Sequence, residues 1–466
     1  MNDACTIFAR NFSTLPVFAI FPKLTVAPAL SRGCAVALLF AAQPGRATEL
    51  ITLEQAYDRC LATDQSIRIA GLEIRRANLQ PWSALTRLGP QINGNALLNT
   101  THQTQFAHDA NSGSSFSSVG TTDTRHAGLS LQQPLLDFTV FPAWRLGRLA
   151  AEAARLQQRF TGRQTLFDVA SAYYAVLKQQ RVVEVTTQTV ALAAQQLDLA
   201  QKRAAAGEVA RSDVLRAQAA LEEARRARIE AEGALDLNRD TLSNILNLGG
   251  KTDFTLTEPP DARAGDEPFD VLLGRAYERR EDYKVSSLAI GQEIERRNEV
   301  RAGYAPRVVA QANQNWTRLN SSAESNTGSR VWDATVSVQV PILNGGQREI
   351  DLRAAGYQIG EAQLNCEKVG KSIEAEVKTA WLQIRTLHES LKALRAQVVA
   401  SEQTYHDVQT QYQAGASTSV DVLTALRDLN NSRTELAGAT YDYQVALRNL
   451  LRAEAVFEQE RVEKLK

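Results

Sequence analysis

Histidine, cysteine and methionine, which bind transition metals, are scarce in this chain of 466 residues. It has 5 histidines, 4 cysteines and 1 methionine, and the histidines show no metal-ligand spacing. Gly249-Gly-Lys-Thr252 resembles the end of a phosphate-binding loop, but Ile245 replaces the earlier glycine that this motif requires. We therefore expect no catalytic residue, no metal, no cofactor and no enzymatic activity.

An excess of charge and long apolar runs are also missing. The 52 Lys+Arg residues balance the 52 Asp+Glu residues, which argues against a nucleic-acid-binding protein, because such a protein needs a basic surface. Beyond residue 47 no run of about 20 apolar residues is present to form a membrane-spanning helix. If the mature protein enters a membrane, it must do so as strands.

Residues 1–47 are predicted to be an export signal. Lys23 and Arg32 precede an apolar run over 34–42, and the small-residue site Gly45-Arg46-Ala47 follows. Cleavage there would leave two cysteines on separate helical stretches, Cys60 and Cys366, which are not expected to pair.

The rest of the sequence repeats itself. Ala56-Tyr57 recurs 220 residues later as Ala276-Tyr277, and Ser212-Asp-Val-Leu-Arg-Ala recurs 208 residues later as Val420-Asp-Val-Leu-Thr-Ala. Such spacing indicates a duplicated structural unit. We predict a first repeat over 48–258, a linker over 259–267, a second repeat over 268–457 and a C-terminal tail over 458–466.

Both repeats have the same predicted order of elements. The helices are expected over 52–80, 142–205 and 210–247 in the first repeat, and over 268–300, 349–413 and 418–456 in the second. After the first helix, Pro90 or Pro306 leads into two strands around a polar loop, 107–123 or 321–329. About 64 helical residues would reach roughly 95 Å, which is too long for a compact bundle.

A coiled-coil seam runs along the long helix of the second repeat. Its apolar residues step alternately by four and three positions: Ile373, Val377, Ala380, Ile384, Leu387, Leu391, Leu394 and Val398. In the first repeat the same pattern begins with Leu166, Ala170, Tyr173 and Leu177.

The clearest strand runs from Val331 to Val340, where apolar and polar residues alternate with a period of two. About ten such residues suit an outer-membrane β-barrel, and a polar face rich in Asn, Gln and Thr disfavours the alternative of a soluble, half-buried sheet. The residues predicted to face lipid are Trp332, Ala334, Val336, Val338, Val340, Val308 and Trp316. Four strands cannot close a barrel alone, and open strand edges do not persist in lipid, so several chains must share one barrel.

Two turns between long helices carry the same motif. Gly207 and Gly415 permit the left-handed backbone that ends a helix, and Ser212 or Ser419 is expected to cap the next helix. An ordinary helical hairpin explains the glycine and the serine, but not the Asp-Val-Leu-x-Ala that follows both turns.

These features together resemble the TolC family of outer-membrane efflux proteins. The resemblance rests on the doubled layout, Leu53-Glu-Gln-Ala-Tyr57, Leu129-Ser-Leu-Gln-Gln-Pro-Leu-Leu136 and both turns, and it covers about 50–457. It implies an α+β membrane protein: a trimer with a shared twelve-stranded β-barrel, four strands per chain, and a long helical barrel in the periplasm. The implied partners are two further copies of the chain, a periplasmic adaptor, an inner-membrane transporter driven by ATP or protons, and outer-membrane lipid, but no nucleic acid.

The resemblance also implies roles for residues at the helical tips. The tip residues Gly207, Glu208, Val209, Gly415 and Ala416 are expected to contact the adaptor. Asp421 matches an aspartate that lines the periplasmic aperture, and Thr424 stands in place of a second one. Tyr412 and Asp213 match a tyrosine–aspartate link that holds the tip closed, whereas Ser417 replaces the arginine of a second link.

Within the family the chain is similar to the outer-membrane members of type I secretion that export cyclolysin, an adenylate cyclase–haemolysin toxin. This similarity favours protein as the cargo. Multidrug or small-molecule efflux is the first alternative. A periplasmic adaptor is the second, although an adaptor would have one hairpin flanked by compact β modules.

Overall fold

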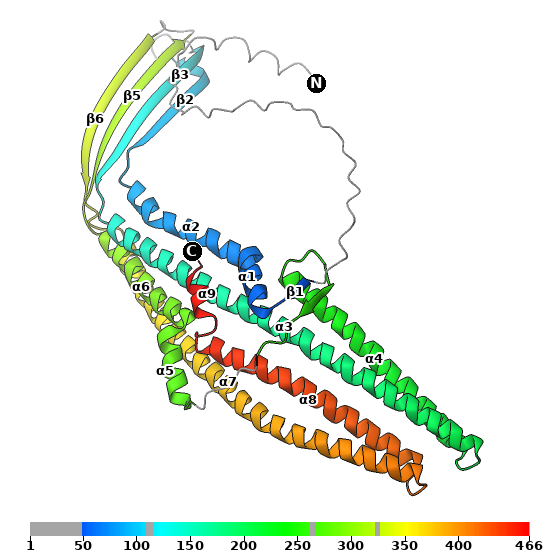
Figure 1. Cartoon of the computed structure of the whole chain (residues 1–466). Coiled ribbons are helices and arrows are strands. Elements are labelled where there is room, and N and C mark those ends of the chain that lie inside the picture. The colour runs from blue at the N-terminus through cyan, green and yellow to red at the C-terminus, as the bar shows by residue number, and fades with distance from the viewer. Residues whose placement is uncertain (1–48, 109–114, 261–266, 322–326, 466) are drawn as a thin grey trace, which may run out of the picture. The chain divides into compact units, whose positions relative to one another are not determined.

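The computed structural model describes residues 49–108, 115–260, 267–321 and 327–465, so the predicted export signal lies outside the described residues. The order of elements repeats, as Figure 1 shows. The first half contains α1 (Leu53–Thr63), α2 (Gln65–Thr86), β2 (Gln91–His108), β3 (Ser115–Leu136), α3 (Val140–Ala205) and α4 (Arg211–Ile245). The second half contains α5 (Phe269–Arg279), α6 (Glu281–Ala302), β5 (Arg307–Ser321), β6 (Thr327–Gln339), α7 (Gln347–Gln413) and α8 (Ser419–Ala453).

The helices expected over 52–80 and 268–300 are each two helices, which corrects the prediction. Asp64 has an extended backbone, with ψ at 134°, and caps α2 by accepting a hydrogen bond from the Ile67 N–H at 3.0 Å. Arg280 has a non-helical backbone at the corresponding place between α5 and α6, with ψ at 126°. One non-helical residue interrupts the helical ladder at each place, and neither has a proline or glycine beside it to signal the break.

The four long strands form one antiparallel sheet in the order β2-β3-β5-β6. Strands of both repeats meet at its centre, where β3 pairs with β5. The loops predicted over 107–123 and 321–329 are too long, because β3 already begins at Ser115 and β6 at Thr327. Polar side chains bridge the strands in this region, as where Thr100 Oγ1 donates to Asp123 Oδ1 at 2.8 Å.

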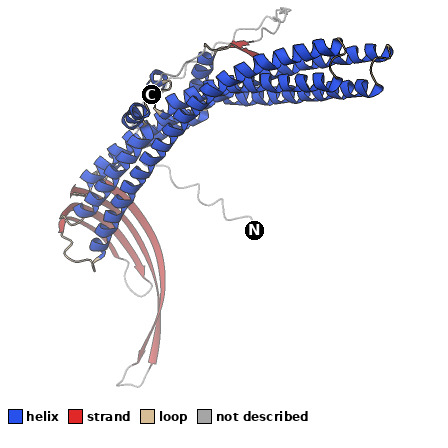
Figure 2. Cartoon of the chain, turned by 90° about the horizontal axis from the view of Figure 1, so that it is seen from below, coloured by secondary structure: helices blue, strands red, loops and turns tan. Residues whose placement is uncertain are grey.

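The two longest helices are α3, with 66 residues, and α7, with 67 residues, so each is about 100 Å long. Helix α3 packs against α2, α4, α6 and α8, and α7 packs against α6 and α8. Figure 2 shows the four long strands gathered into one sheet and the long helices running from it. No helix of the described chain has both the length and the hydropathy needed to cross a membrane.

The predicted seam of α7 is confirmed by its burial. Ile373, Val377, Ala380 and Ile384 are buried, and they pack in one cluster with residues of α8 such as Leu447. In the first half Leu166, Ala170, Tyr173 and Leu177 are buried in the equivalent cluster. The apolar period therefore predicted which side of each long helix is covered.

Two small elements were not predicted. Strand β1 (Glu49–Ile51) pairs in parallel with β4 (Phe254–Leu256), and the Tyr173 hydroxyl lies 2.9 Å from Ile51 O. The segment predicted as a tail contains α9 (Gln459–Glu463), whose Val462 is buried. Both elements depend on contacts with distant parts of the chain, so local sequence patterns give little sign of them.

Candidate functional site

The four-stranded sheet exposes both of its faces. Every residue of β6 is exposed, and Trp332, Val336 and Val338 keep 73%, 66% and 64% of their surface accessible. Burial of such side chains against lipid or protein is favourable by about 25 cal/mol per Å². The sheet is therefore a surface that a larger assembly or a membrane must cover.

One face of the sheet is apolar. Pairing across the strands aligns its members in rows, such as Ile92↔Leu131↔Ala312↔Ala334 and Val308↔Val338. Gln133 and Gln314 lie among these apolar rows, and their side chains donate to backbone carbonyls: Gln133 to Leu88 O at 2.6 Å and Gln314 to Val331 O at 3.1 Å. Of the seven residues predicted to face lipid, Val340 follows the end of β6, and the other six lie in β5 and β6 on this face.

The opposite face is polar and rich in amides. Its rows include Gln91↔Gln132↔Gln311↔Thr335 and Asn93↔Ser130↔Asn313↔Asp333. Asn313 Nδ2 donates to Asp333 Oδ2 at 2.9 Å. Gly128 lies between two asparagines, and a Cβ at this position would come within 2.5 Å of Asn95 Oδ1 and 2.8 Å of Asn315 Oδ1. The amide and hydroxyl side chains of this face can form hydrogen bonds with water, so the face suits the lining of an aqueous path.

The outer edges of the sheet carry no strand partner within the described residues. Strands β2 and β6 are the two ends of the order β2-β3-β5-β6, so each leaves one row of backbone N–H and C=O groups open. Unpaired backbone groups are not tolerated in lipid. If the apolar face lies in a membrane, strands from other chains must complete the sheet.

Helices α3 and α7 both end in the same backbone motif. Gly207 and Gly415 have φ of 79° and 77°, in the left-handed region. The Glu208 N–H donates to Arg203 O at 2.9 Å, and the Ala416 N–H donates to Gln411 O at 2.8 Å. This is the glycine-terminated helix end that the sequence predicted. Its repetition gives the two tips the same turn geometry.

The start of α8 differs from the prediction. Thr418, not Ser419, caps the helix, and Asp421 completes a capping box by accepting from Thr418 Oγ1 at 2.6 Å and the Thr418 N–H at 3.0 Å. These donors, together with Ser417 Oγ at 3.1 Å, lower the pKa of the exposed Asp421. Helix α4 begins after Ala210 without a side-chain cap, so Ser212 is not one either.

The predicted link between Tyr412 and Asp213 is not formed in this structure. Asp213 accepts a hydrogen bond from Arg216 at 3.0 Å, in the same helix. The buried Tyr412 hydroxyl has no hydrogen-bond partner among the described residues. Burial raises the pKa of Tyr412, the positive charge of Arg203 opposes this rise, and the negative charge of nearby Asp213 adds to it.

Arg203 connects the two tips instead, and no sequence pattern singled it out. Its Nη1 donates to Tyr412 O at 2.5 Å, and its guanidinium carbon lies 4.7 Å from the centre of the Tyr412 ring. Its Nε also donates to Glu208 Oε2 at 2.9 Å. A basic residue near a helix C-terminus is ordinary, because it complements the helix dipole. The sequence therefore gave no reason to separate Arg203 from other arginines.

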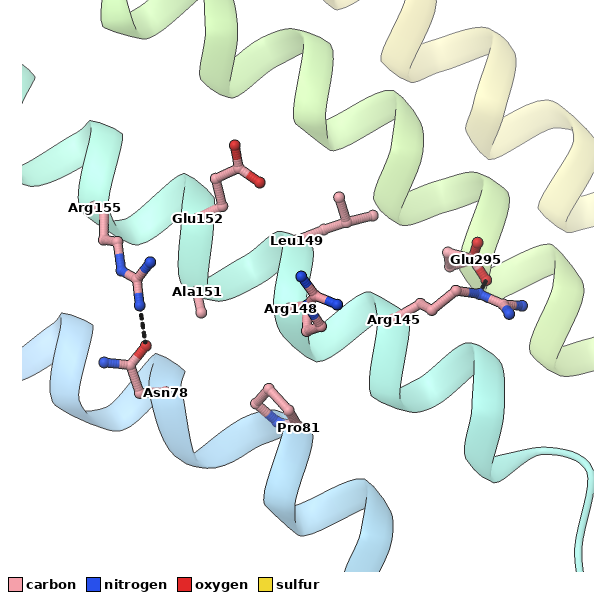
Figure 3. Close-up of a pocket in the computed structure, with 9 residues that line it drawn as sticks. All are labelled: Asn78, Pro81, Arg145, Arg148, Leu149, Ala151, Glu152, Arg155 and Glu295. Atoms are coloured by element: carbon pink, nitrogen blue, oxygen red, sulfur yellow. Dashed lines mark hydrogen bonds and ion pairs between the residues drawn. The ribbon is translucent and has the colours of Figure 1, made fainter.

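A groove of about 590 Å³ lies along α3, between α2 and α6 (Figure 3). Its charged residues are partly paired: Arg145 Nε lies 2.9 Å from Glu295 Oε2, and Arg155 donates to Asn78 Oδ1 at 3.3 Å. The residues that line it include no serine, cysteine or threonine nucleophile and no histidine.

Comparisons with a family model, with related sequences and with solved structures agree with one another. The family model described as "Outer membrane efflux protein" matches residues 56–248 and 272–454. The outer membrane protein TolC of Vibrio cholerae is 23% identical over 407 residues, which cover 86% of this chain and 90% of that protein. The alkaline protease secretion protein AprF of Pseudomonas aeruginosa is 24% identical over 368 residues, which cover 73% of this chain and 74% of that protein. Among solved structures, the CmeC outer membrane channel of Campylobacter jejuni aligns with a TM-score of 0.71 and 16% identity over 89% of each chain.

Proposed function

The chain belongs to the outer membrane efflux protein family, and from this premise we propose that it is the outer-membrane channel-tunnel of a tripartite export system. It is a transport protein of the bacterial outer membrane with the α+β fold of TolC-like channels. The observation that carries the proposal is the sheet, with one apolar face, one amide-rich face and two open edges.

The open edges support a trimer. Four strands per chain are too few for a closed barrel, since single-chain barrels have at least about eight. Three copies of the sheet, joined β2 to β6, would give twelve strands with no open edge. The apolar face would then contact lipid, and the rows of asparagine and glutamine would line the pore.

The long helices support a periplasmic tunnel. Helix α3 begins next to the sheet and ends about 100 Å along its axis at the tip containing Gly207, and α7 does the same for Gly415. In this arrangement the tips lie farthest from the outer membrane. They would contact the adaptor through Glu208, Val209 and Ala416.

We propose that Arg203, Tyr412, Asp213 and Asp421 act at the periplasmic aperture. Arg203 holds the tips of one chain together, and Asp421 would stand near the axis beside Ser417 and Thr424. A ring of carboxylates at a narrow opening favours cations.

Protein is the proposed cargo, delivered by an inner-membrane transporter. The name of AprF, a protease secretion protein, supports this choice. Small-molecule efflux is the second candidate, favoured by the family's name. The adaptor alternative is disfavoured, because the chain has two helical hairpins and four paired strands.

Crosslinking of the edges tests the channel. Single cysteines along β6, at positions 331, 333 and 335, would be combined with one at Asn95 of β2, with Cys60 and Cys366 replaced by serine. We expect an oxidised ladder up to a covalent trimer for the pairs in register, and stepwise conductance of the purified oligomer in planar bilayers. A protein that stays monomeric in every pairing, or is extracted without detergent, would contradict the proposal.

A deletion strain distinguishes the cargo. We expect it to lose secretion of one large protein while its sensitivity to small antibiotics and dyes changes little. The opposite result, with unchanged secretion and increased drug sensitivity, would establish small-molecule efflux instead.

A further inference from the structure

Three arginines lie together on the apolar face of the sheet. Arg125 of β3 is the direct partner of Arg318 in β5, and Arg330 of β6 is the direct partner of Trp316. Side chains two residues apart on a strand share a face, so Arg318 and Trp316 lie on the same side, with Arg330 diagonally next to Arg318. All three arginines are exposed.

The arginines mark the end of the apolar band. The band begins with Val308 and Val338 near the helices and reaches Trp316, eight positions further along β5. At about 3.4 Å per residue this is roughly 27 Å of strand, or about 20 Å of membrane depth after a tilt near 40°. Beyond the arginines the same face becomes polar, with Thr100 opposite Asp123.

The positive charge of this cluster is not neutralised within the described residues. Among the described residues, no carboxylate lies within 4.0 Å of any of the three guanidinium groups. Asp123, the acidic residue nearest along β3 on this face, accepts a hydrogen bond from Thr100. Arg330 lies over the Trp316 ring at 5.8 Å, which orients it but supplies no counter-charge. Like charges directly opposite on neighbouring strands destabilise a sheet, so an external anion would stabilise the pair Arg125–Arg318.

We propose that Arg125, Arg318 and Arg330 bind the phosphate groups of a phosphorylated lipid in the outer leaflet. This inference rests on the proposed function, which places the apolar face in lipid and the hairpin ends of the strands outside. Arginine binds phosphate oxygens through two parallel N–H donors, and the apolar band just below would contact the acyl chains of the same lipid. Continuity of the cluster with the apolar band favours a lipid over a soluble anion, because only a lipid contacts both. A trimer would carry three such sites.

The test compares lipid retention in two triple variants. One is R125Q/R318Q/R330Q, and its matched control is R68Q/R75Q/R76Q, which removes three exposed arginines of α2 that form no ion pair among the described residues. Trimers are placed in nanodiscs containing lipid A or a lipid without phosphate, washed in detergent and examined by native mass spectrometry. We expect the sheet variant to retain about tenfold less lipid A than the wild type, as the loss of several exposed ion pairs predicts, with the control unchanged.

Other outcomes overturn the site. Three outcomes would each contradict a lipid-phosphate site. The wild type and the sheet variant retain equal amounts of lipid A, or the wild type retains the phosphate-free lipid as well as it retains lipid A. The third outcome is the release of lipid A by millimolar inorganic phosphate. The variant R125K/R318K/R330K keeps the charge without the forked donors, so the amount of lipid A that it retains should lie between those of the wild type and the glutamine variant. Such partial retention would show that substitution at these positions does not prevent folding. Conductance of the same nanodiscs separates the two proposals, because a conducting wild-type trimer that retains no lipid A contradicts this site alone.

Discussion

At the scale of single residues, Ala334 and Thr335 give the sharpest comparison in the sheet. They are neighbours in β6, and Ala334 lies in the apolar row with Ala312 whereas Thr335 lies in the amide row with Gln311. An arginine at Ala334, halfway along the apolar band, should cost about 2–4 kcal/mol, because a guanidinium is poorly solvated at the membrane midplane. We expect Ala334→Arg to lower the melting temperature of the trimer on semi-native gels.

Thr335→Arg is the matched control, since it adds the same side chain on the hydrated face. It should leave the melting temperature nearly unchanged and alter conductance instead. If both variants melt at the same temperature, the assignment of the two faces is wrong.

Asp421 provides a pH-dependent prediction. Hydrogen bonds from Thr418 and Ser417 lower its pKa, so the carboxylate stays ionised to a lower pH than an ordinary aspartate does. Its contribution to helix capping is therefore present at neutral pH and is lost only as the pH falls through the lowered pKa. Cation selectivity in planar bilayers should likewise be constant from neutral pH down to about 5.

Asp421→Asn keeps the cap acceptor but removes the charge, and it should weaken cation selectivity at all these pH values. Unchanged selectivity in the variant would remove Asp421 from the aperture. Loss of wild-type selectivity above pH 5 would contradict the predicted constancy, but not the role, because it would show that the copies of Asp421 lie close enough to raise each other's pKa.

At the scale of helices, Arg203 contacts both hairpins of one chain at their tips. Its contacts with Tyr412 O and the Tyr412 ring join α3 to α7 at the tips. A charged hydrogen bond and a cation–π contact each contribute about 1–2 kcal/mol when partly desolvated. We expect Arg203→Ala to separate the tips, raise conductance several-fold and sensitise cells to a bulky antibiotic such as vancomycin.

Arg216→Ala is the control, because among the described residues Arg216 forms its ion pair with Asp213 of its own helix. It should resemble the wild type. Closed channels in the Arg203 variant would show that other contacts hold the tip.

At the scale of the whole chain, one buried ion pair connects the two repeats. Arg163 of α3 lies 2.6 Å from Glu281 at the start of α6, and both side chains are almost fully buried. Arg163 also donates to Phe457 O at 2.6 Å, so it holds the segment that precedes α9. Removing one member leaves the other charge buried, which should cost about 3–5 kcal/mol.

We therefore expect Glu281→Leu alone to reduce trimer stability strongly, as measured by urea unfolding followed by circular dichroism. The double variant Arg163→Leu/Glu281→Leu should recover part of this loss, because no unpaired charge remains. Additive losses would mean that the two residues do not depend on each other.

The sequence by itself determined the features that depend on local periodicity. Ile373, Val377 and Ala380 predicted the buried side of α7, because a seven-residue apolar repeat fixes which side of a long helix avoids water. The alternation around Val336 predicted a two-sided strand, and Gly207 and Gly415 predicted the helix ends, because only glycine adopts positive φ without strain.

Only the tertiary structure decided the features that join distant residues. Five such features depend on the register of strands or on the approach of helices. They are the pairing of β3 with β5, the break at Asp64, the fold of the C-terminal segment, the contact of Arg203 with Tyr412, and the gathering of Arg125, Arg318 and Arg330. Arg203 and Tyr412 are 209 residues apart, and nothing in the local sequence encodes that separation. Such contacts arise from the summed packing of many side chains, so their partners became visible only when the chain was folded.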